Sequence, residues 1–197
     1  MTFNFDSTKK DILNKRDKSN IGIIDDKILE LCNLINSNKN YFTTSSCSGR
    51  ILLAKDNDKK IKNIFLFRTH GKINLKKLKE SIKVCKKYEG VINFKQEPCF
   101  VVVSCRDKNS QWKLFSKARN NGWKKTGILS IDKKFLIEIM STENINFPII
   151  KNNEMLVDDK FLEIIIDKAN INLEKGWKKI NRLVDLINMD TIANGKL

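Results

Sequence analysis

The chain has 197 residues and carries 38 lysine and arginine side chains against 23 acidic ones, a formal net charge of +15. Its hydrophobic fraction of 41% is enough for a core, and two prolines and eight glycines exclude a low-complexity chain. The length suits a single domain over residues 1–197. We find no apolar run long enough to cross a bilayer, and MTFNFDSTKKDILNK lacks the apolar stretch of a secretory signal, so we predict a cytoplasmic protein.

The first half of the chain alternates helical and extended patterns. Residues 3–16 are predicted to form a short helix, and Asp25 can cap a second helix with a stripe of apolar residues. YFTT and RILLA are predicted strands on either side of SSCSG, and IKNIFLFRTH is a strand that ends at His70. Asn74 can then open a third helix with one apolar face. The other face of that helix is almost entirely lysine: Lys76, Lys79, Lys83, Lys86 and Lys87.

The second half begins with strands and ends in a long helix. GVINFKQE and CFVVVSC are predicted strands separated at Pro98, and Asn109 can cap a helix that Gly122 ends. KTGILSI and KFLIEIM indicate a hairpin, and INFPII is a further short strand. From Asp158 the pattern is helical almost to the end. Its apolar face follows a 4, 3, 4, 3 spacing: Leu173, Trp177, Ile180, Val184 and Ile187.

Together these elements predict an α+β fold with a mixed, mostly antiparallel sheet, helices packed on it and a long C-terminal helix. It is not a Rossmann fold, because no GxGxxG follows a strand, and the P-loop and GxSxG motifs are absent as well. The five cysteines are widely spaced, without a CxxC pair, and His70 is the single histidine. This composition predicts reduced thiols and no metal site.

The most unusual segment is YFTTSSCSGR, residues 41–50, and three interpretations of it compete. Cys47 could be a nucleophile, for which His70 is the only histidine base. A turn between two strands is the simplest alternative, since Ser-Gly is typical of turns. The third is an anion site, which is compatible with a turn and which the chemistry favours. Its hydroxyls, glycine backbone and guanidinium would come from Ser45, Ser46, Ser48, Gly49 and Arg50.

Two other polar groups stand at the ends of predicted strands. SCRD, residues 104–107, closes one apolar strand, and His70 closes another. Ionic residues in this position are typical of the rim of a site, although Arg106 and Asp107 could also be a surface pair of little energetic weight. If the strand ends lie on one side, these residues and the segment 45–50 form one pocket.

The remaining basic and aromatic residues have two interpretations. A domain this basic favours phosphate polyanions. The lysines could equally follow from the composition of an AT-rich genome, since many stand beside asparagines. Trp112 and Trp123 flank the fourth predicted helix and are expected in the core rather than as platforms for stacked bases. No known RNA-binding sequence motif is present.

Several segments together resemble a known family. They are YFTTSSCSGRI, a strand ending in histidine, EPCFVVVSCRD, ARNNGWKKTGI, STENINFPI and the C-terminal KANINLEKGWKKINRLVDLI. With DKSNIGIIDDKILELCNLIN near the start, they extend the resemblance over nearly the whole chain. The pattern is similar to the tRNA wybutosine-synthesizing protein 3 family, which includes archaeal homologues.

The resemblance implies an S-adenosyl-L-methionine-dependent methyltransferase that is not built on the Rossmann fold. Its substrate would be tRNA(Phe), and its target the N4 nitrogen of a 4-demethylwyosine-type tricyclic guanosine just 3′ of the anticodon. The reaction would be a step in the biosynthesis of wybutosine derivatives. Methyl transfer to a nitrogen requires in-line approach of the two reactants and does not require Cys47 as a covalent nucleophile.

The resemblance also implies roles for individual residues. His70 and Asp107 are the expected proton acceptors. The segment that would hold the methyl donor or a nucleotide phosphate consists of Ser45, Ser46, Cys47, Ser48, Gly49 and Arg50. Substrate contacts are expected from Glu97, Cys105, Arg106 and the helix lysines Lys76, Lys79 and Lys83.

One position departs from the family's pattern. Met140 stands where the family commonly has arginine before Ser-Thr, so another cation must replace it if that arginine contacts substrate. This departure favours an alternative function, a non-catalytic basic protein that binds RNA or the donor. Whether residues 45–50, His70 and 104–107 meet in one cleft distinguishes the two.

Overall fold

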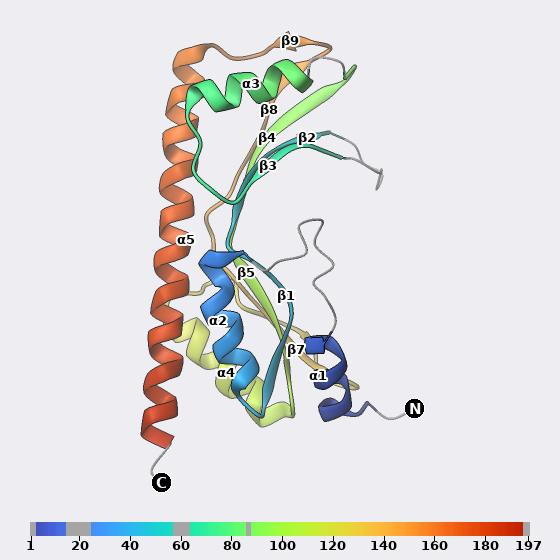
Figure 1. Ribbon diagram of the computed structural model, residues 1–197, viewed down its shortest axis with the longest axis vertical. Helices are drawn as coiled ribbons and strands as arrows, with labels where there is room; N and C mark the ends of the chain where they lie inside the picture. The colour runs from blue at the N-terminus through green and yellow to red at the C-terminus, as the bar shows by residue number, and fades with distance from the viewer. Residues whose placement is uncertain (1–2, 15–24, 57–63, 86–87, 195–197) are drawn as a thin grey trace. The chain divides into compact units, whose positions relative to one another are not determined.

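The computed structural model describes residues 3–14, 25–56, 64–85 and 88–194, with side chains up to residue 189 (Figure 1). The fold is mixed α+β, as predicted, and every strand pairing among these residues is antiparallel. The strands are divided between two sheets, and the chain between two compact units. Unit 1 comprises residues 1–48, 99–142 and 176–197, and unit 2 comprises residues 49–98 and 143–175. A single domain over the whole chain stays a prediction.

Unit 1 contains a four-stranded sheet in the order β1-β5-β7-β6. β1 is Tyr41–Cys47, β5 is Phe100–Cys105, β6 is Gly127–Ser130 and β7 is Phe135–Met140. The predicted hairpin is confirmed, because β6 pairs with β7. β1 is longer than predicted, since Ser45 and the two residues after it continue the strand.

Helices α1 (Phe5–Asn14), α2 (Asp26–Ser37) and α4 (Lys108–Asn120) belong to unit 1. Asp25 caps α2, as predicted, by accepting a hydrogen bond from the backbone N–H of Lys27 at 3.3 Å. The predicted cap of α4 is wrong: Asp107, not Asn109, precedes the helix, and it accepts from the backbone N–H of Ser110 at 2.7 Å.

The core of unit 1 lies between β5, β7 and helices of this unit. α2 contributes its predicted apolar stripe, and the C-terminal part of α5 (Asp159–Asn194) contributes a second stripe. Burial of such faces is what holds amphipathic helices on a sheet. The buried members from these elements include Ile28, Leu31, Ile35, Val101, Val103, Leu114, Ile137, Ile139, Ile180 and Val184.

Unit 2 contains a five-stranded sheet in the order β3-β2-β4-β8-β9. Its strands are β2 (Arg50–Lys55), β3 (Phe65–Thr69), β4 (Val91–Glu97), β8 (Ile145–Lys151) and β9 (Glu154–Met155). β2 pairs with β3 and β4, whereas β1 pairs with β5. Ser48 and Gly49 therefore connect two strands that do not pair with each other, and no β1–β2 hairpin is formed.

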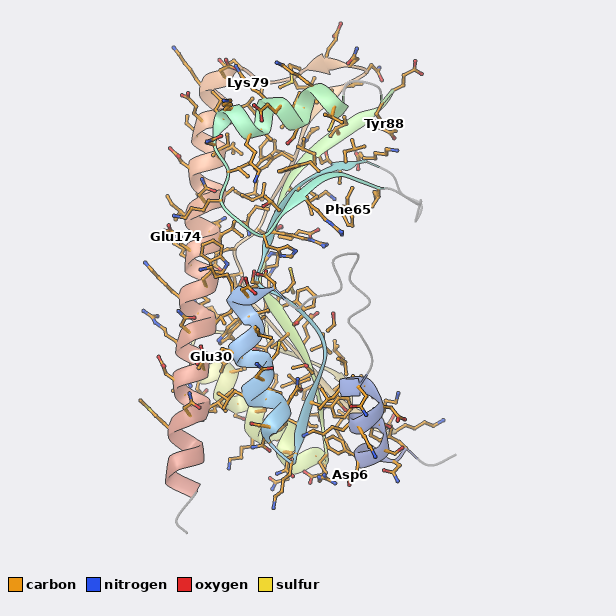
Figure 2. The ribbon with its side chains drawn as sticks, viewed as in Figure 1. Asp6, Glu30, Phe65, Lys79, Tyr88 and Glu174 are labelled. Atoms are coloured by element: carbon orange, nitrogen blue, oxygen red, sulfur yellow. The ribbon has the colours of Figure 1, made fainter. Side chains whose placement is uncertain are left out.

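Helix α3 (Leu75–Cys85) and the first part of α5 (Asp159–Asn194) complete unit 2. Asn74 caps α3 as predicted, by accepting from the backbone N–H of Lys77 at 2.9 Å. Asn170 of α5 exchanges two hydrogen bonds with the backbone of Ile73, at 2.8 and 3.0 Å. Lys79 of α3 forms an ion pair with Asp159, and Figure 2 shows it beside the start of α5.

The cysteines and tryptophans have different outcomes. All five cysteines are buried. Trp123 lies in the core with 1% of its surface exposed, as predicted, whereas Trp112 is 60% exposed and the prediction for it is wrong. Within the described residues, no helix is both long and apolar enough to cross a membrane.

Candidate functional site

Several motif segments of the sequence contain a junction, a boundary between the two compact units. These junctions fall after Ser48, Pro98, Thr142 and Lys175. The first three lie within SCSGR, EPCF and STEN, segments that carry the family resemblance. Each unit therefore holds its own set of motif residues.

In unit 1, Ser48 is committed to a hydrogen bond at the start of α2. Ser48 is completely buried, and its hydroxyl donates to the carboxylate of Asp25, the residue that caps this helix. The direction follows because an ionised carboxylate only accepts. The hydroxyl proton of Ser48 is thus used within the protein, so the predicted anion site loses one of its donors.

Three other junction residues contact one another in unit 1. The backbone N–H of Ser141 donates to the carbonyl of Cys99 at 2.9 Å, and the thiol of Cys99 donates to the carbonyl of Gly176 at 3.7 Å. A Cβ atom at Gly176 would lie 3.2 Å from the sulfur of Cys99, so this position has little room for a larger residue. Met140, which ends β7 opposite Phe100, immediately precedes Ser141.

Two polar atoms next to these junctions are buried and lack a hydrogen-bond partner among the described residues: Ser141 Oγ and Trp177 Nε1. The ammonium group of Lys27 lies 5.2 Å from the centre of the Trp177 ring. A buried donor without a partner costs about 1–3 kcal/mol, so such groups are typical of ligand-binding positions. These donors and this cation suit a ligand that offers acceptor atoms.

In unit 2, Arg50 is paired across two strands. Arg50 of β2 stands opposite Glu97 of β4, and its Nε lies 2.6 Å from the Glu97 carboxylate. The guanidinium also lies 4.9 Å from the centre of the Phe65 ring. The sequence predicts separate roles for Arg50, at an anion, and for Glu97, at the substrate, but the structure brings the two side chains together as one pair. Glu97 offsets the positive charge of Arg50.

His70 contacts the segment 45–50 through a backbone carbonyl. Its Nδ1 lies 3.2 Å from the carbonyl oxygen of Gly49. A carbonyl only accepts, so Nδ1 carries the proton, and in the neutral ring Nε2 is the basic nitrogen. Gly49 has φ +95°, a backbone conformation that favours glycine. The structure therefore brings His70 and Gly49 together, as the pocket hypothesis requires.

A buried amide network lies next to the Arg50–Glu97 pair in unit 2. Asn172 of α5 donates to the Oε1 of Gln96 at 2.8 Å, and Gln96 Nε2 donates to the carbonyl oxygens of Glu97 at 2.8 Å and Glu143 at 3.4 Å. This network joins the end of β4 to α5 and to Glu143, the first residue of unit 2 after the boundary within STEN. The sequence patterns did not predict this network, although an asparagine next to the apolar stripe of α5 is a signal for it.

The residues 104–107 are not part of this arrangement. In the β1–β5 pair, Cys105 stands opposite Tyr41, whereas Cys47 stands opposite Phe100 at the other end. Six residues of strand span about 20 Å, so residues 104–107 lie far from the Cys47 end of β1. The expectation that they share one pocket with residues 45–50 is wrong.

Each of the last three residues in SCRD has a structural role instead. Cys105 is fully buried, and burial, with the nearby charge of Asp107, raises the pKa of its thiol to about 12. Arg106 binds the Asp6 carboxylate with both terminal nitrogens, at 2.5 and 2.9 Å, and also donates to the Lys39 carbonyl. Asp107 caps α4, and the hydrogen bonds from Ser110 lower the pKa of its carboxyl group.

The other predicted binding residues have simple positions. Ser45 and Ser46 lie in β1 opposite Val102 and Val101, Ser45 exposed and Ser46 half-buried, while Cys47 at the end of the strand is buried. On α3, Lys76 and Lys83 are exposed, but Lys79 pairs with Asp159. Lys86 and Lys87 lie outside the described residues.

Comparison with known proteins decides the family. The family model described as Methyltransferase TYW3 matches residues 7–189 of this chain. The chain belongs to the methyltransferase TYW3 family. The matched range includes segments of both units and all the predicted site residues discussed above.

Individual relatives of this TYW3-family chain agree. A Thermococcus sibiricus protein named tRNA(Phe) 7-((3-amino-3-carboxypropyl)-4-demethylwyosine(37)-N(4))-methyltransferase is 34% identical, over 93% of this chain and 94% of that protein. A tRNA wybutosine-synthesizing protein 3 homolog from Danio rerio is 32% identical, over 93% of this chain and 74% of that protein. A solved structure of a Pyrococcus horikoshii protein matches with a TM-score of 0.84 and 32% identity, covering 94% of this chain and 95% of that one.

The TYW3-family chain is therefore a methyltransferase, and its reaction implies a methyl donor. The buried donors Ser141 Oγ and Trp177 Nε1 fit the acceptor atoms of such a molecule. In the described part of the chain, no group of three or more histidine, cysteine or acidic side chains is placed to hold a metal ion.

Proposed function

We propose that this chain transfers a methyl group from S-adenosyl-L-methionine to the N4 nitrogen of a 4-demethylwyosine-type tricyclic guanosine next to the anticodon of tRNA(Phe). We expect this step of wybutosine-derivative biosynthesis to take place in the cytoplasm. One observation carries the proposal: archaeal proteins named for this N4 methylation are 32–34% identical to the chain over 82–93% of its length.

We assign His70 as the group that receives the proton of the methylated nitrogen. S-adenosyl-L-methionine, when bound, supplies the methyl group as an electrophile on sulfur, which leaves as a neutral thioether. The nitrogen must lose its proton as the new carbon–nitrogen bond forms, and a positioned base contributes about 10²–10⁴-fold to such a step. His70 suits this role because its hydrogen bond to the Gly49 carbonyl places the basic lone pair on Nε2.

We assign donor binding to the motif segment and to two buried donors. Ser141 Oγ and Trp177 Nε1 would donate to acceptor atoms of S-adenosyl-L-methionine, such as its carboxylate, with Lys27 adding positive charge beside the indole ring. The residues proposed from the sequence remain candidates: Ser45, Ser46, Cys47, Ser48, Gly49 and Arg50. Ser48 would act as an acceptor or through Asp25, since its proton is already donated.

We assign tRNA contacts to exposed cations on α3 and to the Arg50–Glu97 pair. Lys76 and Lys83 are exposed and can approach the phosphate backbone, whereas Lys79 is paired with Asp159. Cys105, Arg106 and Asp107 are left out of the proposal because each has a structural role.

Transfer of a labelled methyl group tests the proposed function. The purified chain is incubated with labelled S-adenosyl-L-methionine and tRNA(Phe) taken from cells arrested before this step, and the modified nucleoside is identified by mass spectrometry. Incorporation at N4 is the expected result, and mature tRNA(Phe), already methylated, is the control. Tight tRNA binding without incorporation would instead support a non-catalytic RNA-binding protein.

A further inference from the structure

An exposed column of ring systems lies on α4 in unit 1. The ring of Trp112, which is 60% exposed, stacks on Phe115 with centroids 5.3 Å apart and planes 21° from parallel. The guanidinium of Arg119 lies 6.0 Å from the centre of the Phe115 ring. Positions 112, 115 and 119 share one helix face, so the column follows from the i, i+3, i+7 spacing. A tryptophan that only fills a core is largely buried, so the exposure of Trp112 indicates another role.

β6 and the turn after it also carry exposed apolar side chains. Gln111 of α4 donates to the carbonyl oxygens of Ser130 at 2.7 Å and Leu136 at 3.1 Å, so the start of α4 is joined to the end of β6. Leu129 and Ile131, on either side of Ser130, are 55% and 59% exposed. We call Trp112, Phe115, Arg119, Leu129, Ile131 and the exposed basic residues of the same segment, residues 108–133, the α4–β6 surface.

The α4–β6 surface is strongly basic. Residues 108–134 contain one acidic residue, Asp132, against eight lysine and arginine residues, most of them exposed. Two of the eight are used elsewhere in unit 1: Lys117 donates to the backbone carbonyl of Leu186 at 2.6 Å, and the ammonium of Lys134 lies 5.4 Å from the centre of the Phe3 ring. The other six are Lys108, Lys113, Arg119, Lys124, Lys125 and Lys133. The cores of protein–protein interfaces are depleted of lysine, so this composition does not suit a protein partner. It suits an anionic partner that also offers flat apolar faces.

We propose that the α4–β6 surface binds unpaired nucleotides of the tRNA substrate, with a base stacked on Trp112 and phosphates near the exposed lysines of residues 108–133. Unpaired bases stack on exposed aromatic side chains while basic side chains follow the backbone, whereas bases inside a duplex present no free face. This inference rests on the proposed function for the identity of the RNA. It assigns Trp112 to binding and leaves proton transfer to His70.

Substitution of the tryptophan tests the stacking contact. Trp112→Ala is expected to raise the Kd for tRNA(Phe) about tenfold, since one stacked base contributes roughly that factor or more. Trp112→Phe should restore most of the affinity. Ile164→Ala is the matched control, because Ile164 is 66% exposed on the unit 2 part of α5 and should leave the Kd unchanged. The melting temperature of each variant and the methyl-transfer rate at saturating tRNA should match those of the parent chain.

Salt dependence tests the cationic part of the surface. The double variant Lys124→Gln, Lys125→Gln should reduce the slope of log K against log salt concentration by about 1.4, at roughly 0.7 for each single-strand phosphate contact. Lys160→Gln with Lys168→Gln is the control, because these exposed lysines stand among Asp158, Asp159, Glu163 and Asp167 on α5. Their replacement should leave the slope unchanged.

The outcomes separate this inference from the proposed function. An unchanged Kd for Trp112→Ala overturns the inference, and so does a change in oligomeric state, measured by light scattering, without an effect on tRNA. If the wild-type chain fails to transfer methyl groups but Trp112→Ala still weakens tRNA binding, the proposed reaction is wrong and the RNA-binding surface stands. An isolated anticodon stem–loop locates the stretch: an equal loss of affinity places the stacked base in the loop, and a loss seen with full-length tRNA alone places it elsewhere in the tRNA.

Discussion

Two segments of this chain look alike in the sequence and differ in the structure. They are SCSGR, residues 46–50, and SCRD, residues 104–107. Both bring serine, cysteine and arginine to the end of a strand. In the first, Gly49 contacts His70 and Arg50 pairs with Glu97. In the second, Arg106 holds Asp6 of α1 and Asp107 caps α4 (Figure 2 labels Asp6).

The difference shows what a polar strand end can mean. SCRD leads directly into a helix within the same unit, so its side chains satisfy the free backbone groups of the helix start and hold a neighbouring helix. SCSGR leads into a strand of the other sheet, so only Ser48 is used at a helix start, through Asp25, the cap of α2, and Gly49 and Arg50 contact residues of unit 2. The element that follows a polar cluster is therefore a better guide to its role than the composition of the cluster.

The largest effect is expected for His70, the proposed proton acceptor. His70→Ala should lower the single-turnover rate of methyl transfer by about 10²–10⁴-fold, because the nitrogen loses its positioned base. The Kd for tRNA should be unchanged, and circular dichroism should report an intact fold. Asp107→Ala, measured in parallel, should keep the parental rate. If the rate of His70→Ala stays within about threefold of the parental rate, His70 is not the proton acceptor.

Arg50→Ala should produce the next largest effect, through binding. Removing the guanidinium leaves the partly buried Glu97 carboxylate without its partner, and charged hydrogen bonds of this kind contribute about 1.5–3 kcal/mol. We expect kcat/KM to fall by about tenfold or more. Arg106→Ala, which breaks the pair with Asp6, should leave kcat/KM unchanged and serves as the matched arginine control. Unchanged kinetics for Arg50→Ala would remove Arg50 from the site.

A stability change without a change in rate is expected for Asp107. Asp107→Ala should lower the free energy of unfolding by about 0.5–2 kcal/mol, the usual range for loss of a helix cap. Equilibrium urea denaturation at neutral pH measures this difference, with kcat/KM as the second readout. A loss of kcat/KM under conditions in which the variant is fully folded would show that Asp107 belongs to the active site.

The pH dependence sharpens the same test. Hydrogen bonds from Ser110 lower the pKa of Asp107 in the folded chain, so its stabilisation is complete above the unfolded pKa, near 4, and is lost as the pH falls through the lowered folded value. The stability difference between the parent and Asp107→Ala should therefore shrink below about pH 4. A difference that stays constant down to pH 2 would contradict the capping role.

The smallest effect is expected for Cys47→Ser. Cys47 is buried at the end of β1, and methyl transfer from sulfur to nitrogen needs no covalent cysteine intermediate. The variant should keep measurable methyl transfer, with a stability loss of about 1 kcal/mol for placing a hydroxyl in an apolar position. Cys105→Ser, at the buried far end of the β1–β5 pair, is the comparison. Complete loss of activity in a folded Cys47→Ser variant would instead support Cys47 as a covalent nucleophile.

The local structure was largely predictable. The caps at Asp25 and Asn74, the β6–β7 hairpin and the apolar stripes of α2 and α5 depend on residues a few positions apart. The cap of α4 was predicted two residues too late, because both Asp107 and Asn109 suit a cap. The prediction for Trp112 failed because exposure depends on where the whole helix packs, and the core face of α4 is formed by Leu114 and Ala118.

The candidate site was predictable in part. The motif segments indicated the family, and the family model confirmed it. The contact of His70 with Gly49 is consistent with the predicted pocket. The position of residues 104–107 at the far end of β1 is not consistent with it. Ser141, Trp177 and the Gln96–Asn172 network were missed, because each acquires its significance from burial and from partners distant in the sequence.

The sequence by itself determined the helices, the strands and the chemistry of the motif residues, since propensity, capping and periodicity act between neighbours in the chain. Only the tertiary structure decided which strands share a sheet and therefore which polar residues meet. Arg50 and Glu97 are 47 residues apart and pair through the β2–β4 register, and Asp25 and Ser48 meet at the start of α2. Such pairings depend on the packing of whole elements, because a side chain's partner across a sheet is set by register and not by its own neighbours.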